Sequence, residues 1–273
     1  MNNTPVKMGI IGCGNMGGAF AKALAQLPHV HLFIYDRNMH KMRAAAKGKE
    51  KFVLVNSPAE VAAAADLVML CVKPQGLLEV VQSIAHQLTF QKVLLSIAVG
   101  INTASIRAAA GSICPVVRIM PNTPLLVGEG VFALALDDQS LAAEQKEIIA
   151  SLLERMGKVY VMPEEKIDAF SSIVGSGPGF FYIFLQAMEE AAVAVGFSRK
   201  DAKEMVLATA KGSATLAEST GNTFQELYEM VASPAGTTIA GALHLERTGV
   251  RGHIADAVLA AYNRARELGN ANK

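Results

Sequence analysis

A series of short, mainly apolar runs alternates with segments of helical periodicity, and this alternation limits the fold of the first half of the chain more than any other feature. Runs that are apolar on both faces are typical of parallel strands covered by helices on both sides. The strand runs lie at residues 8–12, 31–36, 52–55, 67–72, 93–98 and 115–120, and the helical segments between them at 16–27, 57–65, 77–88 and 103–110. This order predicts a doubly wound α/β sheet.

The pattern changes after Pro163, where apolar residues recur at three- and four-residue spacing and β-branched runs end. Before that point, weak strands near 130–136 and 158–161 flank a helix at 141–156 and extend the sheet. Beyond it we expect almost only helix, at residues 164–174, 178–195, 198–219, 223–231, 237–248 and 251–268. We therefore predict an α/β domain over residues 1–162 and an all-α domain over residues 163–273.

The helices of the second half are rich in Ala and poor in large aromatic side chains. Such helices pack closely, and their apolar faces exceed what one chain can cover, which favours a helical dimer interface. The apolar side chains of the segment "GFFYIF", residues 179–184, are expected to be core.

Composition excludes several classes of partner. The chain has 25 basic and 24 acidic residues and no basic run, so we expect no nucleic-acid partner. The apolar run at 61–72 contains Asp66 and is too short to span a bilayer, so we expect no membrane partner. Glycines, an asparagine and Lys22 interrupt the apolar stretch near the start, which does not fit a secretory signal, and we expect a cytoplasmic protein.

Cysteine and histidine patterns give no metal site. Cys13, Cys71 and Cys114 are odd in number and form no C-x-x-C pair, so we expect buried thiols in a reducing compartment rather than disulfides. The six histidines are scattered without carboxylates at ligand spacing, so we assign no metal.

A glycine-rich segment directly after the first predicted strand carries the strongest functional signal. Gly12, Gly14 and Gly17 form a G-x-G-x-x-G pattern that opens a helix. Gly12 permits the tight turn, Gly14 lets a diphosphate approach the backbone, and Gly17 allows close strand–helix packing. The N–H groups of the first helical turn, at Asn15 and Met16, would face the diphosphate. The pattern predicts a Rossmann-like dinucleotide-binding domain.

Two neighbouring residues at the end of the next strand point to different cofactors. A carboxylate at Asp36 would accept hydrogen bonds from the ribose hydroxyls of NAD and repel a 2′-phosphate, whereas Arg37 could pair with that phosphate. At about 4 Å each effect amounts to roughly 1–4 kcal/mol, so neither clearly dominates. A solvated loop position is the alternative interpretation of Arg37.

Five motifs in order along the chain resemble the pyrroline-5-carboxylate reductase family: "GCGNMGGA", "CVKPQ", "RIMPNTP", "GSGPGFFY" and "SPAGTTIAGAL". The resemblance covers essentially the whole chain. It implies a nucleotide domain for NADP(H), with NAD(H) as the alternative, and a helical dimerisation domain that intertwines with a second subunit in a homodimer or larger homo-oligomer. It also implies reduction of 1-pyrroline-5-carboxylate to L-proline, the last step of proline biosynthesis.

The resemblance assigns further residues to the cofactor. Val72, Lys73 and Pro74 would lie along the nicotinamide ribose, Ala98 would lie near the nicotinamide ring, and Asn56 would contact the adenosine side. Ligands of such sheets bind beyond the carboxyl ends of the parallel strands, which agrees with these positions. A surface lysine at Lys73 and a turn-forming asparagine at Asn56 are the alternatives.

The segment from Ser233 to Thr238 places small residues before a helix, and we interpret it as a cradle for the substrate carboxylate. Its members are Ser233, Pro234, Ala235, Gly236, Thr237 and Thr238. The Thr238 hydroxyl is the candidate donor near the imine nitrogen, either supplying the proton or only positioning the substrate. Glu218 is a further candidate substrate contact, with a solvated helix carboxylate as the alternative.

This chain departs from the family at one position of that segment. The family usually has two glycines where this chain has Ala235-Gly236, and the methyl group either narrows the pocket or is tolerated. A plain connector that restarts a helix is the simpler interpretation of the whole segment.

Overall fold

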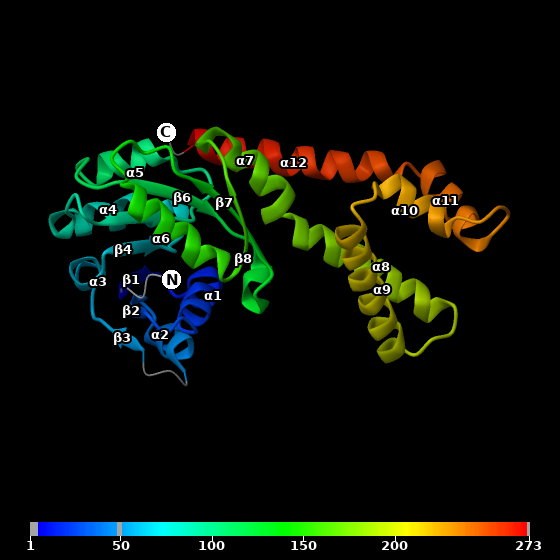
Figure 1. Ribbon diagram of the computed structural model, residues 1–273, viewed down its shortest axis with the longest axis horizontal. Helices are drawn as coiled ribbons and strands as arrows, with labels where there is room; N and C mark the ends of the chain where they lie inside the picture. The colour runs from blue at the N-terminus through cyan, green and yellow to red at the C-terminus, as the bar shows by residue number, and fades with distance from the viewer. Residues whose placement is uncertain (1–4, 48–50, 272–273) are drawn as a thin grey trace. The chain divides into compact units, whose positions relative to one another are not determined.

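The computed structural model describes residues 5–47 and 51–271 (Figure 1). Its contacts divide the chain into two compact units. Unit 1 consists of Met1–Ser176 together with Ala261–Lys273, and unit 2 consists of Gly177–Ala260.

Unit 1 is built on an eight-stranded sheet with the order β3-β2-β1-β4-β5-β6-β7-β8. Neighbouring strands are parallel except for β6 and β7, which pair antiparallel with Arg118 opposite Ala135. This order confirms the expected Rossmann-like doubly wound sheet. The strands are β1 Val6–Ile11, β2 Val30–Tyr35, β3 Phe52–Leu54, β4 Leu67–Leu70, β5 Val93–Ser96, β6 Val116–Met120, β7 Gly130–Ala135 and β8 Gly157–Val161.

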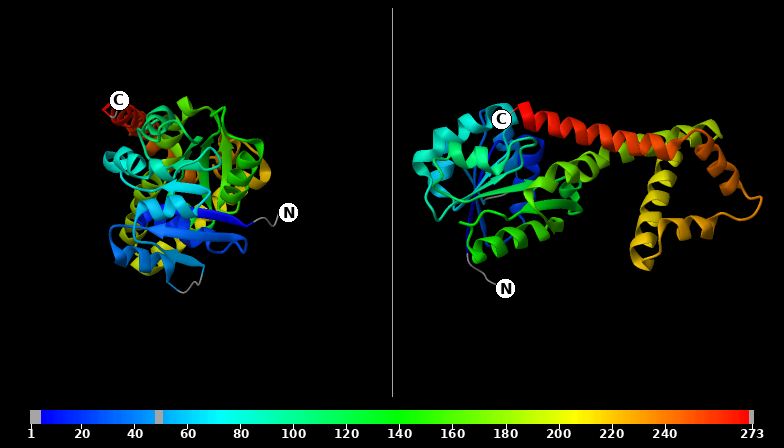
Figure 2. Two further views of the ribbon diagram at one scale, coloured as in Figure 1. Left: turned by 90° about the vertical axis from the view of Figure 1, so that its left-hand side faces the viewer. Right: turned by 90° about the horizontal axis from the view of Figure 1, so that it is seen from above.

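Helices cover both faces of this sheet (Figures 1 and 2). One apolar cluster joins the sheet to α1, α2 and α6, and a second joins it to α3, α4 and α5. Every residue of β4, β5 and β6 is buried, which explains why these strands read as continuous apolar runs. The helices are α1 Asn15–Leu24, α2 Met39–Ala46, α3 Pro58–Ala64, α4 Leu77–Ile84, α5 Thr103–Ala109 and α6 Ala143–Glu154.

Helix α2 is absent from the helices expected from the sequence. The helix is short, its polar residues His40, Lys41 and Arg43 interrupt the apolar periodicity, and only Met42 and Ala45 are buried. The helix begins where the Asn38 side chain accepts a hydrogen bond from the His40 N–H at 3.0 Å. A capping asparagine therefore provides the local signal that the periodicity does not.

The single helix expected at 164–174 is in fact three short pieces. A 3₁₀ turn at Glu164–Lys166 leads into α7, Ile167–Phe170, which is followed by a π-helical turn at Ser171–Gly175. Ile167 is fully buried in an apolar cluster with residues of β6 and β7, so unit 1 continues to Ser176. The domain boundary that we expected near Met162 falls directly after β8 and stays a prediction.

Unit 2 is all-helical, as expected. It comprises α8 Gly177–Ala194, α9 Arg199–Thr220, α10 Phe224–Val231, α11 Thr237–Arg247 and the first part of α12 Val250–Ala271. Side-chain caps start two of these helices: Ser198 accepts from the Asp201 N–H, and Thr223 forms a capping box with Glu226.

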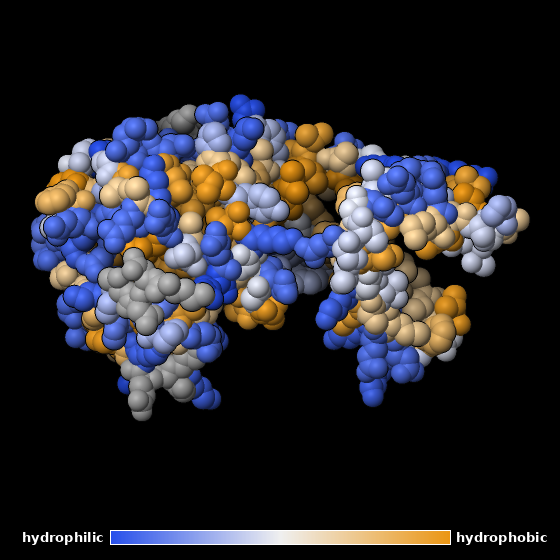
Figure 3. All heavy atoms as spheres, in the orientation of Figure 1, coloured by the Kyte–Doolittle hydropathy of each residue, from blue (hydrophilic) through white to orange (hydrophobic). Residues whose placement is uncertain are grey.

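Unit 2 has almost no core of its own. Among its residues, all of which the structure describes, only Ala202 is buried. Phe181, Tyr182 and Ile183 are 69%, 62% and 69% exposed, and apolar surface is visible on this unit in Figure 3. The expectation that "GFFYIF" is core is therefore wrong for the single chain, because no described part of unit 2 buries these side chains.

In the part of the chain that the structure describes, no helix is both long enough and apolar enough to cross a bilayer.

Candidate functional site

The glycine-rich turn lies between the ends of β2 and β4. Its first glycine donates its N–H to Tyr35 O at 2.7 Å, while Cys71 N–H donates to Ile11 O at 2.8 Å. Gly12 has a φ of +101°, and a Cβ there would lie 2.6 Å from Cys71 O. A Cβ on Gly17 would overlap Gly12 O, so the turn and the start of α1 pack without room for side chains.

Gly14 differs from the other two glycines because open space surrounds it. A Cβ there would meet nothing within 4 Å. Gly14 is the N-cap residue of α1, no side chain caps that helix end, and its first turn contains no acidic residue. The N–H groups at Asn15 and Met16 thus lie at a helix N-terminus that suits an anion. These residues fit a bound diphosphate.

Asp36 is attached to the glycine-rich turn. Its Oδ2 accepts a hydrogen bond from the Cys13 N–H at 2.7 Å, and its Oδ1 accepts one from the Asn38 N–H at 2.8 Å. Arg37, the next residue, is exposed. The structure therefore gives Asp36 a role in holding the turn, which the sequence pattern alone did not suggest.

Two thiols at this turn have raised pKa values: that of Cys13, within the turn, and that of Cys71, beside it. Burial, together with the neighbouring Asp36 carboxylate, raises the pKa of Cys13 to about 12. Burial also raises the pKa of Cys71 far above its ordinary value. All three cysteines are free thiols, those of Cys13 and Cys114 buried and that of Cys71 half-buried, and their raised pKa values leave none poised as a nucleophile.

The residues assigned to the nicotinamide side follow the carboxyl ends of two adjacent strands, β4 and β5. Val72 is half-buried, Lys73 is exposed, and Pro74 begins a 3₁₀ turn. Ala98 is 4% exposed, and its N–H donates to Ser96 Oγ at 3.3 Å. The ends of β4 and β5 lie side by side in the sheet, with Leu70 opposite Ser96, which brings these segments together.

Asn56 takes part in starting a helix. It is exposed, and its N–H donates to Glu60 Oε2 at 3.0 Å, beside the Ser57 cap of α3. This contact supports the turn-forming alternative, while contact with adenosine stays a prediction.

The segment Ser233–Gly236 is a tight turn that leads directly into α11. Gly236 N–H donates to Ser233 O at 3.0 Å, Pro234 occupies the second position, and Ala235 has a φ of +58°. These features are those of a type II turn, whose third position favours glycine. Ala235 is one of two described non-glycine residues with a positive φ, the other being Ser112. The glycine that the family usually has at this position would adopt this positive φ without strain.

The N-terminus of α11 has no side-chain cap. Gly236 is its N-cap residue, Thr237 and Thr238 form its first turn, and no acidic residue lies there. A Cβ on Gly236 would collide with Ser233 Oγ, so this hydroxyl lies next to the helix end. Thr238 is exposed, and so is Glu218 on α9. The geometry of the turn supports an anion site, and the individual roles stay predictions.

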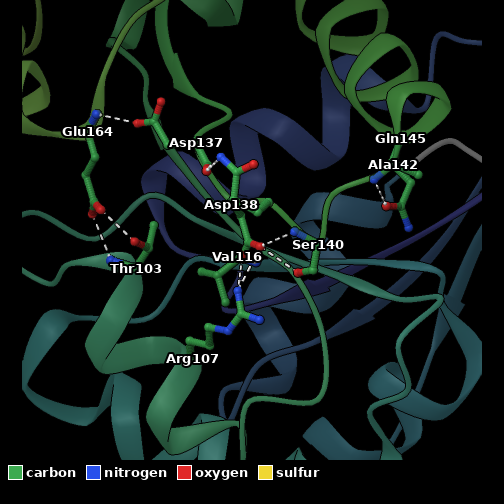
Figure 4. Close-up of polar contacts among 10 residues, drawn as sticks. Thr103, Arg107, Val116, Asp137, Asp138, Ser140, Ala142, Gln145 and Glu164 are labelled. Atoms are coloured by element: carbon green, nitrogen blue, oxygen red, sulfur yellow. Dashed lines mark hydrogen bonds and ion pairs between the residues drawn. The ribbon is translucent and has the colours of Figure 1, made fainter.

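Unit 1 contains a polar network that its sequence did not predict. Glu164 accepts hydrogen bonds from Thr103 N–H at 2.8 Å and from its hydroxyl at 2.5 Å (Figure 4). Arg118, only 5% exposed, pairs with Glu164 at 3.3 Å and with Asp168 at 3.2 Å. Because 46 to 50 residues separate these partners, no local pattern could reveal them.

A third ion pair of unit 1 joins Arg107 to Asp138 through two 2.8 Å contacts (Figure 4). Burial alone would raise the pKa of Asp138, but hydrogen bonds from Ser140, Val116 N–H and Arg107 lower it below its ordinary value. Within the described ranges, no cluster of three or more His, Cys, Asp or Glu side chains is arranged to hold a metal ion.

Comparisons with known proteins agree with this geometry. Residues 164–268 match the family model for pyrroline-5-carboxylate reductase dimerisation, and residues 7–100 match that of NADP oxidoreductase, coenzyme F420-dependent. Pyrroline-5-carboxylate reductase of Pseudomonas aeruginosa is 37% identical over 97% of both chains. The enzyme of Corynebacterium melassecola is 35% identical over 95% of this chain and 97% of its own.

A solved structure resembles almost the entire chain. The crystal structure of Plasmodium falciparum pyrroline carboxylate reductase with NADP bound matches with a TM-score of 0.88 and 30% identity, over 97% of this chain and 98% of that one. The fold of almost the entire chain thus occurs in a solved protein of similar length. The chain belongs to the pyrroline-5-carboxylate reductase family.

Proposed function

We propose that this protein reduces 1-pyrroline-5-carboxylate to L-proline with a hydride from NAD(P)H, the final step of proline biosynthesis. The observation that carries the proposal is the uncapped N-terminus of α11, preceded by the Ser233–Gly236 turn, in a chain that also holds a dinucleotide turn. One element suits an anionic substrate, and the other suits a diphosphate cofactor.

The first turn of α1 would hold the cofactor. The N–H groups at Asn15 and Met16 would face the diphosphate, and the open space at Gly14 would let it approach the backbone. NADP(H) is the favoured cofactor, and NAD(H) is the alternative. Arg37 would pair with the 2′-phosphate, while Asp36 fixes the turn through Cys13 N–H.

The α11 N-terminus would bind the substrate carboxylate. The N–H groups at Thr237 and Thr238 and the Ser233 hydroxyl would donate to it, each charge-assisted hydrogen bond contributing roughly 1.5–3 kcal/mol. A pyrroline ring has few other polar groups, so these hydrogen bonds to its carboxylate would orient the C=N bond. Glu218 is a further candidate, which would accept a hydrogen bond from the ring nitrogen.

When bound, reduced nicotinamide would supply the hydride that the imine carbon accepts. A proton on nitrogen completes the amine, and Thr238 either delivers that proton or holds a substrate that arrives protonated. Val72, Lys73, Pro74 and Ala98 would border the nicotinamide half. Most of the acceleration comes from holding the two reacting carbons together, since threonine is a weak acid.

The apolar surface of unit 2 supports self-association. Phe181, Ile183 and Phe224 are each more than two-thirds exposed in the single chain, and residues 164–268 match a dimerisation model. A second copy of the chain is therefore proposed to cover this face, in a homodimer or a larger homo-oligomer. The three free thiols support the proposed reducing, cytoplasmic location.

A β-hydroxyacid dehydrogenase is the competing function for such a two-part chain. Enzymes of that type need a general base for an alcohol, usually a lysine on the first long helix of the second domain. Helix α8 of this chain contains no lysine. The observed sequence of α8 therefore favours the imine substrate.

The test is initial-rate kinetics with 1-pyrroline-5-carboxylate and a panel of hydroxyacids, each with both nicotinamide cofactors. We expect NADPH oxidation with 1-pyrroline-5-carboxylate and formation of L-proline. Turnover of hydroxyacids alone would refute the proposal. Tight cofactor binding without oxidation would instead indicate a dinucleotide sensor.

A further inference from the structure

The loop that follows β5, residues 97–102, is fixed at both of its ends. At the start, Ala98 N–H donates to Ser96 Oγ at 3.3 Å. At the end, Asn102 caps α5 by accepting from Ser105 N–H at 2.7 Å. Ala98 and Ile101 are 4% and 2% exposed, so the loop is packed rather than free. In the proposed function this loop borders the nicotinamide ring.

The middle of this loop lies directly against the last turn of α12. Gly100 is buried and has a φ of +75°. A Cβ on it would lie 2.8 Å from both Gly269 N and Leu268 C, and 3.1 Å from Leu268 O. Glycine also occupies the facing position, and a Cβ on Gly269 would lie 3.7 Å from Gly100 Cα. Two backbone segments of the chain thus meet at a point where neither has a side chain.

The same helix end adjoins the Arg118 network. A Cβ on Gly269 would lie 4.0 Å from Asp168 Oδ2, on α7 beside the end of α12 (Figure 1). Asp168 pairs with Arg118, and Arg118 pairs with Glu164. Glu164 in turn receives the N–H and the hydroxyl of Thr103, at the start of α5. The contacts therefore run from the end of α12 back to the far side of the same loop, all within unit 1.

We propose that the C-terminal turn of α12, at Leu268–Gly269, is a positioning element that holds the loop at Ala98–Gly100 against the nicotinamide half of the cofactor. Helix α12 has 22 residues, about 33 Å of continuous helix, and begins three residues after α11 ends. The turn at Leu268–Gly269 belongs to the part of this helix that lies in unit 1, as does the loop that follows β5. The inference rests on the proposed function for the identity of that cofactor half.

The test compares three variants. Ending the chain at Glu267 removes the turn, and Gly100→Ala places a methyl group against the α12 backbone. Gly111→Ala is the matched control: Gly111 has a φ of +71°, yet a Cβ there would meet nothing closer than 3.6 Å. The control therefore carries the same backbone strain without the contact.

The readout separates the two halves of the cofactor. The Kd of NADPH and that of 2′-phospho-ADP-ribose, which lacks nicotinamide, are measured without substrate, and kcat is measured with 1-pyrroline-5-carboxylate. The truncation and Gly100→Ala are expected to lower kcat by about 10- to 100-fold, the effect of misplacing reacting atoms by about 1 Å. NADPH binding should weaken in both, while the fragment binds as in the parent chain. Gly111→Ala should change none of these values.

A combined variant tests the contact itself. In the chain that ends at Glu267, Gly100→Ala should change kcat and the Kd of NADPH no further than Gly111→Ala does, because the backbone that the new methyl group would meet is gone. Three results would overturn the inference. The first is an equal loss of affinity for NADPH and for the fragment, and the second is an unchanged kcat in the truncated chain. The third is a combined variant in which Gly100→Ala lowers kcat as much again as it does in the full chain. If the parent chain binds NADPH but does not reduce 1-pyrroline-5-carboxylate, the proposed function fails, and the two Kd values still decide the positioning role.

Discussion

Replacing Ala235 by glycine tests how the substrate turn is held. Ala235 has a φ of +58° at the third position of the Ser233–Gly236 turn, a conformation that costs a non-glycine residue roughly 1–2 kcal/mol. Glycine removes that strain but increases the entropy of the unfolded chain, which costs roughly 0.4–1 kcal/mol. The free energy of unfolding should therefore change by about 0 to +1.5 kcal/mol.

The assay is denaturant unfolding at one fixed protein concentration, because association contributes to stability. Ser112→Gly is the matched control, since Ser112 has a φ of +57° outside the proposed site. Both variants should gain similar stability. A loss of more than about 1 kcal/mol in Ala235→Gly alone would refute the strain argument, because unfolded-state entropy cannot account for more.

The same variant decides whether the methyl group narrows the substrate pocket. The proposed donors are the Ser233 hydroxyl and the N–H groups at Thr237 and Thr238, none of which belongs to Ala235, so the KM for 1-pyrroline-5-carboxylate should stay within about 2-fold, or about 0.4 kcal/mol. A tenfold decrease in KM in Ala235→Gly, absent in Ser112→Gly, would show instead that the methyl group intrudes on the substrate.

Three further predictions concern single side chains. Thr238→Ala should lower kcat by less than about 10²-fold if the hydroxyl only positions the substrate, whereas a larger loss that Thr238→Ser restores would identify a proton donor. Arg37→Ala should raise the KM for NADPH and leave that for NADH unchanged; equal changes in steady-state kinetics would exclude contact with the 2′-phosphate. Asp138 has a lowered pKa in the folded chain, so its stabilising contacts are complete above its unfolded pKa of about 3.9 and are lost as the pH falls through the folded value. Tm measured against pH should fall more steeply below about pH 4 in the parent than in Asp138→Asn, and parallel curves would contradict this.

The sequence predicted those parts of the fold that repeat locally. Continuous apolar runs located the buried strands, and the spacing of Gly12, Gly14 and Gly17 located the turn, because backbone sterics at Gly12 and Gly17 leave no room for a side chain. The end of α4 shows the limit of such patterns: the helix expected to Leu88 ends at Ile84 and continues as a 3₁₀ turn.

Contacts between distant segments could not be predicted. The meeting of Gly100 with Gly269 joins residues far apart in the chain, and neither glycine stands out in sequence. Arg118 lies within a strand-like run, so its pairing with Asp168 is invisible until α7 is in place. The antiparallel pairing of β6 and β7 likewise depends on a short connection through the 3₁₀ turn at Thr123–Val127 rather than on composition.

The near absence of buried residues in the helical unit has a consequence for how this protein folds. Helices α8 to α11 cannot bury enough apolar surface within one chain to offset the entropy of ordering them. We therefore predict that their folding depends on association with further copies of the chain, and that the midpoint of thermal denaturation rises with protein concentration. At high dilution we expect the helices of unit 2 to unfold while the sheet of unit 1 stays folded.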